Sequence, residues 1–559
     1  MTMPTRSLKA LLLCLLASCG MAAQAAEPVL FDWFDYQGHD RAFEQPLPAG
    51  HFRNPVLAGF YPDPSVVRVA DTFYLVNSSF AYYPGIPVFE SRDLVHWKPV
   101  SHVIDKPTTL DFDGLNMSRG VFAPDISHHD GTFYVVNTAV DSGGNFVSTA
   151  KSAAGPWSDP VWLKGIGGID PSLFFDKDGK AYLLNNDEPE GKPLYEGHRA
   201  IWLQQFDPVS LKPVGKRQVI INGGTNLARH PIWIEGPHIY QRNGWYYLMC
   251  AEDGTGPQHS EVVFRSRSVW GPYVPYEGNP ILTQRDLPAD RPNAITNAGH
   301  ADLVEAADGS WWAVFLASRA YDGTHYNTGR ETYLLPVEWH DDWPVILPHG
   351  RAIPQVVKGP AFMQRNASQA PLSGNFDARD DFDSTTLGSE WLFARTPKQS
   401  WADLSSHPGK LAIHPLAQDL DTLKNPSYLA RRQQHLAFEA STALAVPAAG
   451  VEAGIAAYQN EHYWYAFGVR HEGDHLRLSL RRHRGDDKTV VDSVVLPASV
   501  GELKLKISGD GKVYGFAYDD GSGWKWLERQ ADGSLLSTDV AGGFIGATVG
   551  PYARRLDNQ

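Results

Sequence analysis

A hairpin unit that recurs five times before residue 314 most constrains the fold of this 559-residue chain. Each unit joins a short segment to an aromatic or aliphatic strand through a tight turn such as Asn243-Gly244, a strong hairpin signal. The turns lie about 50 to 65 residues apart, a period typical of propellers and solenoids. Each interval accommodates roughly four short strands, as in one propeller blade. The repeat predicts an all-β, five-bladed β-propeller. The turn residues are Asp71, Asp130, Asp178, Asn243 and Asp308.

The same repeat places four chemically capable side chains at equivalent positions. Asp63, Asp170, Glu235 and His300 each stand eight residues before the turn residue of their unit. Equivalent positions on successive blades converge at one end of a propeller's central channel, so we expect these side chains to surround a single small pocket. One Asp before Pro is more often a turn or strand cap, so it is the repetition that favours a shared functional site.

The chain is longer than one hydrophobic core usually covers, so we expect two domains. Residues 27–358 are assigned to the propeller domain, with 27–50 as an irregular lead-in. Residues 359–374, rich in Ala, Ser, Pro and Asn, are interpreted as a linker. Residues 375–559 hold many short alternating segments with polar turns, which predicts a C-terminal β-sandwich.

Residues 1–26 have the pattern of a signal peptide, with Arg6 and Lys9 before a short apolar core and a cleavage site at Ala23-Gln24-Ala25, where small residues flank Gln24. The run 16–19 also resembles a bacterial lipobox, which would leave Cys19 lipidated at the mature N-terminus. Both alternatives stay open. Both predict an exported protein, periplasmic or secreted, and the second adds a lipid anchor. No stretch is long and apolar enough to span a bilayer.

Charge and spacing exclude several functions. The formal net charge of −14 argues against nucleic acid or an anionic membrane as a partner. His471 to His475 has the HExxH spacing of zinc sites, which requires a helix. Here the motif lies between strand-like segments and contains Gly473, so it predicts a hairpin turn.

Three carboxylates in one pocket suit glycoside hydrolysis. The reaction needs a carboxylic acid to protonate the leaving oxygen and a carboxylate to activate water or attack the anomeric carbon. A third carboxylate near the acid raises the acid's pKa, because two like charges close together are costly. A non-catalytic sugar-binding propeller is the alternative from another class, and it would be favoured if one carboxylate were missing.

Three motifs carry a resemblance to a known family. They are Phe60-Tyr61-Pro62-Asp63-Pro64-Ser65, Gly168-Ile169-Asp170-Pro171-Ser172 and Ile234-Glu235-Gly236-Pro237-His238. They resemble the catalytic motifs of glycoside hydrolase family 43, whose members have a five-bladed propeller and invert at the anomeric centre. The segment from Phe382-Asp383 with Trp391 is similar to the concanavalin-like sandwich of the family's two-domain β-xylosidases.

The resemblance implies a role for each carboxylate. Asp63 would be the general base on the attacking water, Glu235 the general acid, and Asp170 the residue that orients Glu235 and tunes its pKa. The mechanism would be a single displacement with inversion, with base and acid about 6.5 to 9.5 Å apart to admit water.

Five further residues are candidates for the substrate site. By resemblance, Arg319 would contact the sugar, since its fork of donors suits hydroxyls. His300 matches an axial histidine that in many members touches water around a channel Ca²⁺ ion, whereas the alternative is hydrogen bonding in the channel alone. Phe80, Tyr83 and Phe122 are candidates for stacking on the sugar ring. No cofactor is expected to be required; a structural Ca²⁺ ion stays open.

The sequence therefore favours an exo-acting β-xylosidase that releases xylose from the non-reducing ends of xylo-oligosaccharides. An α-L-arabinofuranosidase acting on arabinoxylan or arabinan side chains is the main alternative, because the two sugars present similar hydroxyls. An endo-arabinanase would need an open groove. The sandwich is expected to buttress the propeller and narrow its pocket, with a separate sugar-binding role as the other interpretation.

Overall fold

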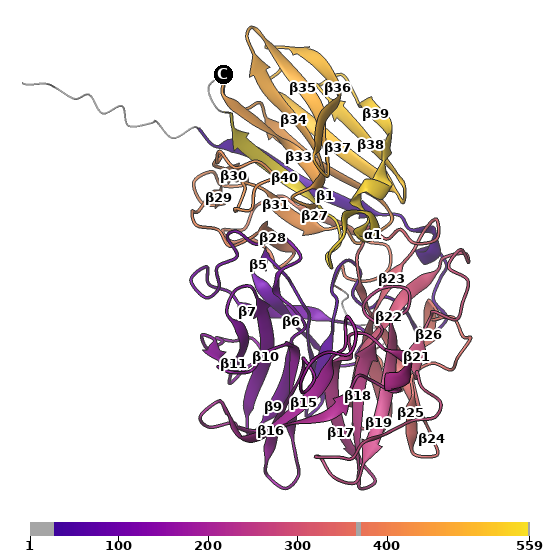
Figure 1. Ribbon diagram of the computed structural model, residues 1–559. Coiled ribbons are helices and arrows are strands. Elements are labelled where there is room, and N and C mark those ends of the chain that lie inside the picture. Colours follow the sequence, from indigo (N-terminus) through magenta and orange to yellow (C-terminus); the bar gives the residue numbers. More distant parts are fainter. Residues whose placement is uncertain (1–26, 365–369, 557–559) are drawn as a thin grey trace, which may run out of the picture.

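The computed structural model describes residues 27–364 and 370–556, which form a β-propeller with a β-sandwich stacked on one end (Figure 1). The predicted signal peptide at 1–26 lies outside the described residues, so export stays a prediction. Helical structure in the described part is limited to η1 (Arg41–Phe43), η2 (Leu227–Arg229), η3 (Gly533–Leu536) and α1 (Thr538–Ala541). None of these has the length and apolar character that crossing a membrane requires.

Five antiparallel sheets form the propeller, as the sequence repeat predicts. The first blade holds β3 (Ser65–Val69), β4 (Thr72–Val76), β6 (Gly85–Ser91) and β7 (Lys98–Ile104). The second holds β8 (Gly120–Val121), β9 (Asp125–His129), β10 (Thr132–Val140), β11 (Gly144–Ala150) and β12 (Val161–Trp162). The third holds β13 (Ile169–Phe175), β14 (Ala181–Asp187), β15 (Ala200–Asp207) and β16 (Lys212–Asn222).

The last two blades complete the ring. The fourth holds β17 (Glu235–Arg242), β18 (Trp245–Glu252), β19 (Ser260–Ser266), β20 (Val274–Pro275) and β21 (Leu282–Thr283). The fifth holds β22 (Ile295–Glu305), β23 (Trp311–Arg319), β24 (Glu331–His340) and β25 (Trp343–Val345). Outside the blades, β2 (His51–Arg53) pairs with β26 (Val356–Lys358), so the two ends of the propeller segment meet.

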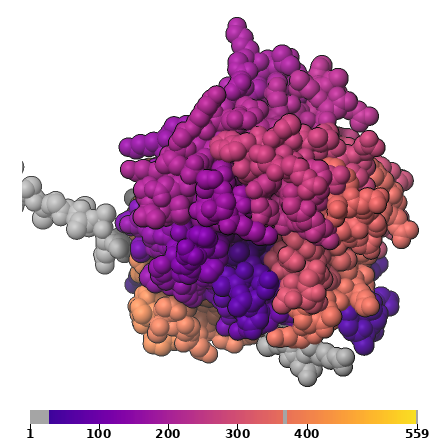
Figure 2. Space-filling model, turned by 90° about the horizontal axis from the view of Figure 1, so that it is seen from below, coloured from indigo at the N-terminus to yellow at the C-terminus, as the bar shows by residue number. Residues whose placement is uncertain are grey.

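The innermost strands β3, β9, β13, β17 and β22 each contact the next around the ring, and β22 contacts β3. Figure 2 views the propeller from the end opposite the sandwich, and the sequence colours follow one another around this face. The innermost strands therefore line a central channel. Side chains at equivalent positions of these strands therefore lie at the same level of the channel.

The predicted turns connect the two strands of each hairpin. Asn243 and Gly244 have φ values of 51° and 73° between β17 and β18. Positive φ at both central residues is the requirement of a type I′ turn, whose twist matches the flanking strands. The HExxH-spaced segment is a hairpin as well, because β34 (Tyr463–Glu472) and β35 (His475–Arg484) pair across Gly473 and Asp474.

Two facing sheets form the sandwich. One has the order β29 (Ala402–Asp403), β30 (Leu411–Ile413), β1 (Val29–Gly38), β32 (Ala437–Ala445), β37 (Glu502–Asp510), β38 (Val513–Asp519), β39 (Lys525–Asp532), with β27 (Asp377–Asp380) also pairing with β1. The other has the order β36 (Asp487–Pro497), β35, β34, β33 (Val451–Asn460), β40 (Thr548–Arg555), β31 (Leu429–Arg432), β28 (Trp391–Ala394), β5 (Tyr82–Tyr83).

The assignment of residues 27–50 to an irregular lead-in of the propeller is wrong for its first part. Strand β1 lies inside the sandwich, hydrogen-bonded to β32 along most of its length. Phe31, Phe34 and Tyr36 are buried in the sandwich core. Their near-alternating spacing is that of a strand with one buried face, and a register shift between Phe31 and Trp33 brings Phe34 to the same side.

The two domains share a sheet and an apolar core. Strand β5 comes from the propeller but pairs with β28 of the sandwich, with Tyr83 opposite Phe393. One cluster of buried side chains includes Phe80 and Tyr82 from the propeller and Trp464 from the sandwich. The C-terminal part of the predicted linker is also packed, because Leu372 is buried in the propeller core. The domains thus form one continuous body.

Candidate active site

Asp63, Asp170, Glu235 and His300 line one cavity of about 600 Å³, together with Phe544 of the sandwich. The cavity therefore lies at the end of the channel that faces the sandwich. The four side chains converge as the sequence repeat predicts.

Local backbone geometry aims these side chains. Asp63, Asp170 and His300 have φ values of 52°, 52° and 53°. Glu235 directly precedes Gly236, whose φ is 56°. Register shifts interrupt β13, β17 and β22 at these points. Bulges with a left-handed residue turn a side chain away from its ordinary strand direction, and they are common next to active sites.

Arg330 determines the charge of Asp63. Its Nη1 lies 2.8 Å from Oδ1 of Asp63, and both side chains are buried. Ser78 also donates a hydrogen bond from its hydroxyl to Oδ2. Burial alone would raise the pKa of Asp63, but Arg330, with help from His300 and Ser78, outweighs burial and holds the pKa below its ordinary value. Asp63 is therefore ionised at neutral pH.

Glu235 has the opposite shift. Burial, together with the charges of Asp170 and Asp63, raises its pKa well above the ordinary value. For Asp170, burial and the charge of Asp63 raise the pKa to about 7, against a hydrogen bond from the Gly236 N–H to Oδ2. The pocket thus pairs a carboxylate with a carboxylic acid, the two states that general base and general acid require.

His300 is neutral in this setting. Burial lowers the pKa of its imidazole to about 4, although the carboxylate of Asp63 favours the charged form. Its Nδ1 lies 4.0 Å from Oδ1 of Asp63. Its side chain also lies against Gly236, because a Cβ at that glycine would be 2.8 Å from Nε2. His300 therefore packs between the base-bearing and acid-bearing strands as an uncharged group.

His300 forms a group with Asp170 and Glu235 in which the possible metal-ligand atoms all lie within 4.8 Å of one another. Asp125, His238 and Asp302 come together deeper in the channel. Asp302 already accepts hydrogen bonds from Ser65 and Tyr240. Although burial opposes it, the carboxylates of Asp302 and Asp125 raise the pKa of His238 to about 9, so a cation is already present there.

Calcium takes about six to eight oxygen ligands. The two carboxyl groups beside His300 supply fewer oxygens than that, so protein oxygens alone do not complete such a site among the described residues. A Ca²⁺ ion contacted by His300 through water stays a prediction.

Three phenylalanines wall the pocket on the side of the sandwich. The ring of Phe544 stacks with that of Phe80, with centroids 6.0 Å apart, and meets Phe122 edge-on at 5.7 Å. The Phe544 N–H donates to the Ser118 hydroxyl, which ties this sandwich loop to the propeller. The structure therefore places the candidate stacking residues Phe80 and Phe122 in the cavity wall, and it adds Phe544.

Tyr83 is not part of the cavity. Its hydroxyl donates to the carbonyl of Asp105, and its ring lies against Phe393 of the sandwich. Tyr83 belongs to the strand that pairs with β28, so its side chain serves the domain interface. This corrects the prediction that Tyr83 stacks on the sugar ring.

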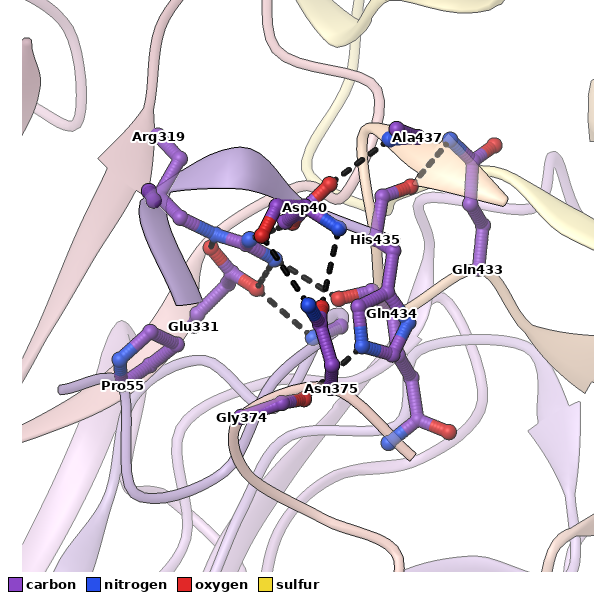
Figure 3. A network of polar contacts seen from close by, with 12 residues as sticks. Asp40, Pro55, Arg319, Glu331, Gly374, Asn375, Gln433, Gln434, His435 and Ala437 are labelled. Carbon is purple, nitrogen blue, oxygen red and sulfur yellow. Dashed lines mark hydrogen bonds and ion pairs between the residues drawn. The ribbon is translucent and has the colours of Figure 1, made fainter. Parts of the chain in front are cut away.

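Arg319 does not line the cavity; it lies in a network of polar contacts with Asp40 and Glu331 (Figure 3). Its guanidinium forms a two-pronged contact with Glu331 at 2.7 and 2.8 Å, pairs with Asp40, and donates to the carbonyl of Gln434. These partners come from the fifth blade, the segment after β1 and the sandwich. Arg319 therefore joins the domains, which corrects the prediction that it contacts the sugar.

Arg330 has the place in the pocket that the sequence analysis predicts for Arg319. It lines the cavity, contacts Asp63, and lies near the rings of Phe80 and Phe544. Neither Arg330 nor Phe544 stands in a repeated motif, so the sequence pattern offered no signal for them. Both sit in connections, Arg330 directly before β24 and Phe544 before β40.

Comparison with known proteins agrees with this geometry. Residues 52–344 match the model of glycosyl hydrolases family 43, and residues 379–559 match that of the β-xylosidase C-terminal concanavalin A-like domain. A xylosidase/arabinosidase of Butyrivibrio fibrisolvens is 36% identical over 89% of this chain and 95% of its own length. A non-reducing end α-L-arabinofuranosidase of Bacteroides ovatus is 38% identical over 90% of this chain and 91% of its own.

The solved structures agree as well. A GH43_12 protein retrieved from a capybara gut metagenome superposes with a TM-score of 0.89 at 39% identity, covering 94% of this chain and all of that one. The match includes both domains, and the pocket pairs an ionised with a protonated carboxyl group. The chain is a glycoside hydrolase and belongs to glycoside hydrolase family 43.

Proposed function

We propose that this family 43 enzyme is an exo-acting, inverting hydrolase that releases xylose from the non-reducing ends of xylo-oligosaccharides. The observation that carries the proposal is the opposite shift in pKa of Asp63 and Glu235 within one cavity. Glycoside hydrolysis by a pair of carboxyl groups needs these two protonation states at the same pH.

In the proposed reaction, ionised Asp63 removes a proton from a water molecule as its oxygen attacks the anomeric carbon. Glu235 gives its proton to the glycosidic oxygen as the bond to the leaving group breaks. Asp170 keeps Glu235 protonated through the charge repulsion described above. Arg330, which lines the same cavity, holds Asp63 ionised and offers donors to the sugar hydroxyls. Exchange with water then restores both carboxyl groups.

The exo mode is supported by the shape of the site. Phe544 and the loop that carries it reach over the cavity from the sandwich, and the Ser118 contact fixes that loop. A cavity of about 600 Å³ has the size of a small-molecule pocket of roughly 300 to 1,000 Å³. It suits a terminal sugar and the bond that follows it.

An α-L-arabinofuranosidase activity is the second candidate. The Bacteroides ovatus relative carries that name, and the Butyrivibrio fibrisolvens relative is named for both activities. Side chains of arabinoxylan or arabinan would be the substrates. The two candidates use the same acid and base, and they differ only in the sugar that fits beside Arg330 and the phenylalanines.

One experiment tests acid, base and specificity. Wild type, Glu235→Gln and Asp63→Asn are assayed on aryl and oligomeric β-D-xylosides and on the matching α-L-arabinofuranosides. General acid–base catalysis typically contributes about 10² to 10⁴ in rate, so we expect losses of that order on substrates with poor leaving groups. Glu235→Gln should retain more activity on aryl substrates, whose leaving groups need less protonation.

Proton NMR of the first sugar released completes the test. The α-anomer of xylose from a β-xyloside supports inversion. Release of the β-anomer, or full activity of Glu235→Gln on xylo-oligosaccharides, contradicts the proposal.

We also propose export from the cytoplasm and no required cofactor. The signal-like pattern at 1–26 supports the first part, and mass spectrometry of the mature N-terminus distinguishes cleavage after the signal from a lipidated Cys19. For the second part, activity and Tm after EDTA treatment should equal those of the untreated enzyme. A loss restored by Ca²⁺ would instead support the structural ion at His300.

A further inference from the structure

Two residues that line the active-site cavity, Arg199 and Trp233, take no part in the proton transfers described above. Arg199 directly precedes β15, and Trp233 stands two residues before Glu235. The guanidinium carbon of Arg199 lies 4.5 Å from the centroid of the Trp233 ring. The two side chains thus form a stacked pair in the wall of the cavity.

The guanidinium of Arg199 is poorly satisfied by the protein. Its Nε is buried and has no acceptor among the described residues. Within the described chain its only ion pair is with Glu188 at 3.7 Å, longer than a hydrogen bond, and the Glu188 side chain is 66% exposed. Ion pairs with such exposed partners are weak. Arg199 therefore has donors for a molecule in the cavity, whereas Arg319 has carboxylate and carbonyl partners within the protein.

The backbone is arranged to hold the Trp233 ring in place. Trp233 has a φ of 52°, a left-handed conformation that is unfavourable for a bulky residue. Its N–H donates to the carbonyl of Gly197 at 2.8 Å, and the carbonyl of Ile232 accepts from the Asp253 N–H at 2.8 Å. Gly197 lies in the loop that carries Arg199, so one of these hydrogen bonds ties the two halves of the pair together. Strain of this kind is concentrated at functional sites, where the surrounding contacts maintain it.

The stacked pair lies beside the general acid. Burial and the neighbouring carboxylates raise the pKa of Glu235, and the charges of Arg330 and Arg199 act against this rise. Arg330 belongs to the side of the base, since it contacts Asp63 and lies near two of the phenylalanine rings. Glu235 gives its proton to the oxygen that joins the terminal sugar to the next one. The second sugar begins at that oxygen, so it must lie among the side chains that surround the acid.

We propose that Arg199, held against Trp233, binds the second sugar of the substrate, on the leaving-group side of the bond that breaks. The inference rests on the hydrolase function proposed above and assigns the residue that favours oligosaccharides over simple glycosides. Arg199 donates hydrogen bonds to the oxygens of this sugar. A guanidinium already held flat on an indole ring loses little freedom when it forms them. A phenyl leaving group has no polar atoms and cannot use these donors.

Kinetics on two matched substrates test this contact. Wild type, Arg199→Gln and Arg199→Lys are assayed on xylobiose and on phenyl β-D-xyloside, which share the terminal sugar and differ in the leaving group. Hydrogen bonds to charged groups are among the stronger ones, so we expect Arg199→Gln to lower kcat/KM on xylobiose about tenfold or more. The loss on the phenyl xyloside should be much smaller. Arg199→Lys should recover part of the activity on xylobiose, because the charge remains.

A double-mutant cycle tests the role of Trp233. If the indole positions the guanidinium, the effect of Arg199→Gln on xylobiose should shrink in a Trp233→Leu background. An effect of the same size in both backgrounds contradicts that role. Arg267→Gln is the matched control, because Arg267 stacks on Trp245 with its guanidinium carbon 3.5 Å from the ring centroid, is exposed and does not line the cavity. It should leave kcat/KM unchanged on both substrates.

The pH profile separates a sugar contact from an effect on the acid. Loss of the Arg199 charge raises the pKa of Glu235, which moves the basic limb of kcat/KM to higher pH on both substrates. Loss of a sugar contact lowers the plateau of the profile on xylobiose alone. Equal relative losses of the plateau on the two substrates, or no loss on xylobiose, overturn the proposal.

Failure of the proposed function has a different signature. If wild type hydrolyses α-L-arabinofuranosides and no xyloside, the xylose specificity fails, and the same comparison on an arabinobiose and phenyl α-L-arabinofuranoside decides the role of Arg199. Calorimetric titration of Glu235→Gln adds a readout without turnover. Arg199→Gln in that background should weaken binding of the disaccharide about tenfold and leave binding of the monosaccharide unchanged. Equal binding of the disaccharide with and without Arg199 contradicts the contact.

Discussion

Arg330 is the residue on which the division of labour between the carboxyl groups depends. Three buried acids share one cavity, and burial raises the pKa of each. Only Asp63 has a guanidinium 2.8 Å from its carboxylate, and only Asp63 ends below its ordinary pKa. Coulomb interaction with a single fixed cation therefore separates base from acid.

Arg330→Gln tests this effect through the pH profile. The base must be ionised, so the acid limb of kcat/KM follows the pKa of Asp63 in the free enzyme. Removing the cation leaves burial, which raises that pKa. We expect the acid limb to move to higher pH and the maximal kcat/KM to fall. Arg330→Lys should keep the limb closer to wild type. An unchanged limb in Arg330→Gln would show that Arg330 does not set the charge of Asp63.

The choice between Arg319 and Arg330 illustrates what sequence reasoning cannot reach at this scale. The two arginines are eleven residues apart in the fifth blade. Arg319 was assigned to the sugar from its motif, but its partners Asp40 and Gln434 are distant in sequence and became neighbours only through domain docking (Figure 3). No local sequence pattern indicates which arginine will pair with a carboxylate that is distant in sequence.

At the scale of elements, the bulges in the innermost strands hold the site together. Gly236 has a φ of 56°, and an added Cβ would lie 2.8 Å from Nε2 of His300. Glycine is required here for both reasons. The residue before it is Glu235, so the backbone at Gly236 also sets the direction of the acid.

Gly236→Ala should therefore reduce both stability and activity. A strained left-handed residue costs about 1 to 3 kcal/mol, and displacement of His300 would misplace Glu235. Gly131→Ala is the matched control, because Gly131 has a φ of 68° with open space around its Cβ position. We expect a lower Tm in both variants and a loss of kcat only in Gly236→Ala. Equal kcat in the two variants would contradict a role for this contact.

The blades could be predicted because each one has a local sequence signal. A turn with Asp, Asn or Gly, flanked by apolar strands, indicates a hairpin, and five such hairpins at similar spacings indicate the ring. The first strand of the sandwich has no such local partner. Strand β1 pairs with β32, which begins about 400 residues later, so its place follows from a core that assembles late in the chain. The assignment of β1 to the propeller is wrong because its local sequence contains no sign of this distant partner.

At the scale of the whole molecule, β1 makes the sandwich depend on both ends of the chain. Deleting residues 27–38 removes a central strand and the buried side chains Phe31, Phe34 and Tyr36. Each such side chain contributes about 1.5 to 3 kcal/mol, and their sum approaches the entire stability of a domain, about 5 to 15 kcal/mol. The deletion should abolish cooperative melting of the sandwich in calorimetry. Melting that matches the full-length chain would show that β1 is dispensable.

The contribution of the sandwich to the pocket through Phe544 lies at the same scale. Its ring meets Phe80 and Phe122 across the domain boundary, and such aromatic pairs contribute about 0.5 to 1.5 kcal/mol each. Phe544→Ala should widen the cavity and raise KM for xylo-oligosaccharides about tenfold, a free-energy loss of about 1.4 kcal/mol. The change in kcat should be smaller, because the acid and base lie on the propeller.

Two controls separate this effect from general damage to the sandwich. Phe544→Leu keeps an apolar wall and should show a smaller rise in KM. Trp526→Ala removes a partly exposed aromatic from strand β39, away from the cavity, and should leave KM unchanged. If Phe544→Ala also left KM unchanged, the sandwich would support the propeller without shaping its substrate site. A rise in KM in the Phe544 variants but not in Trp526→Ala would make substrate affinity a property of the docked pair of domains.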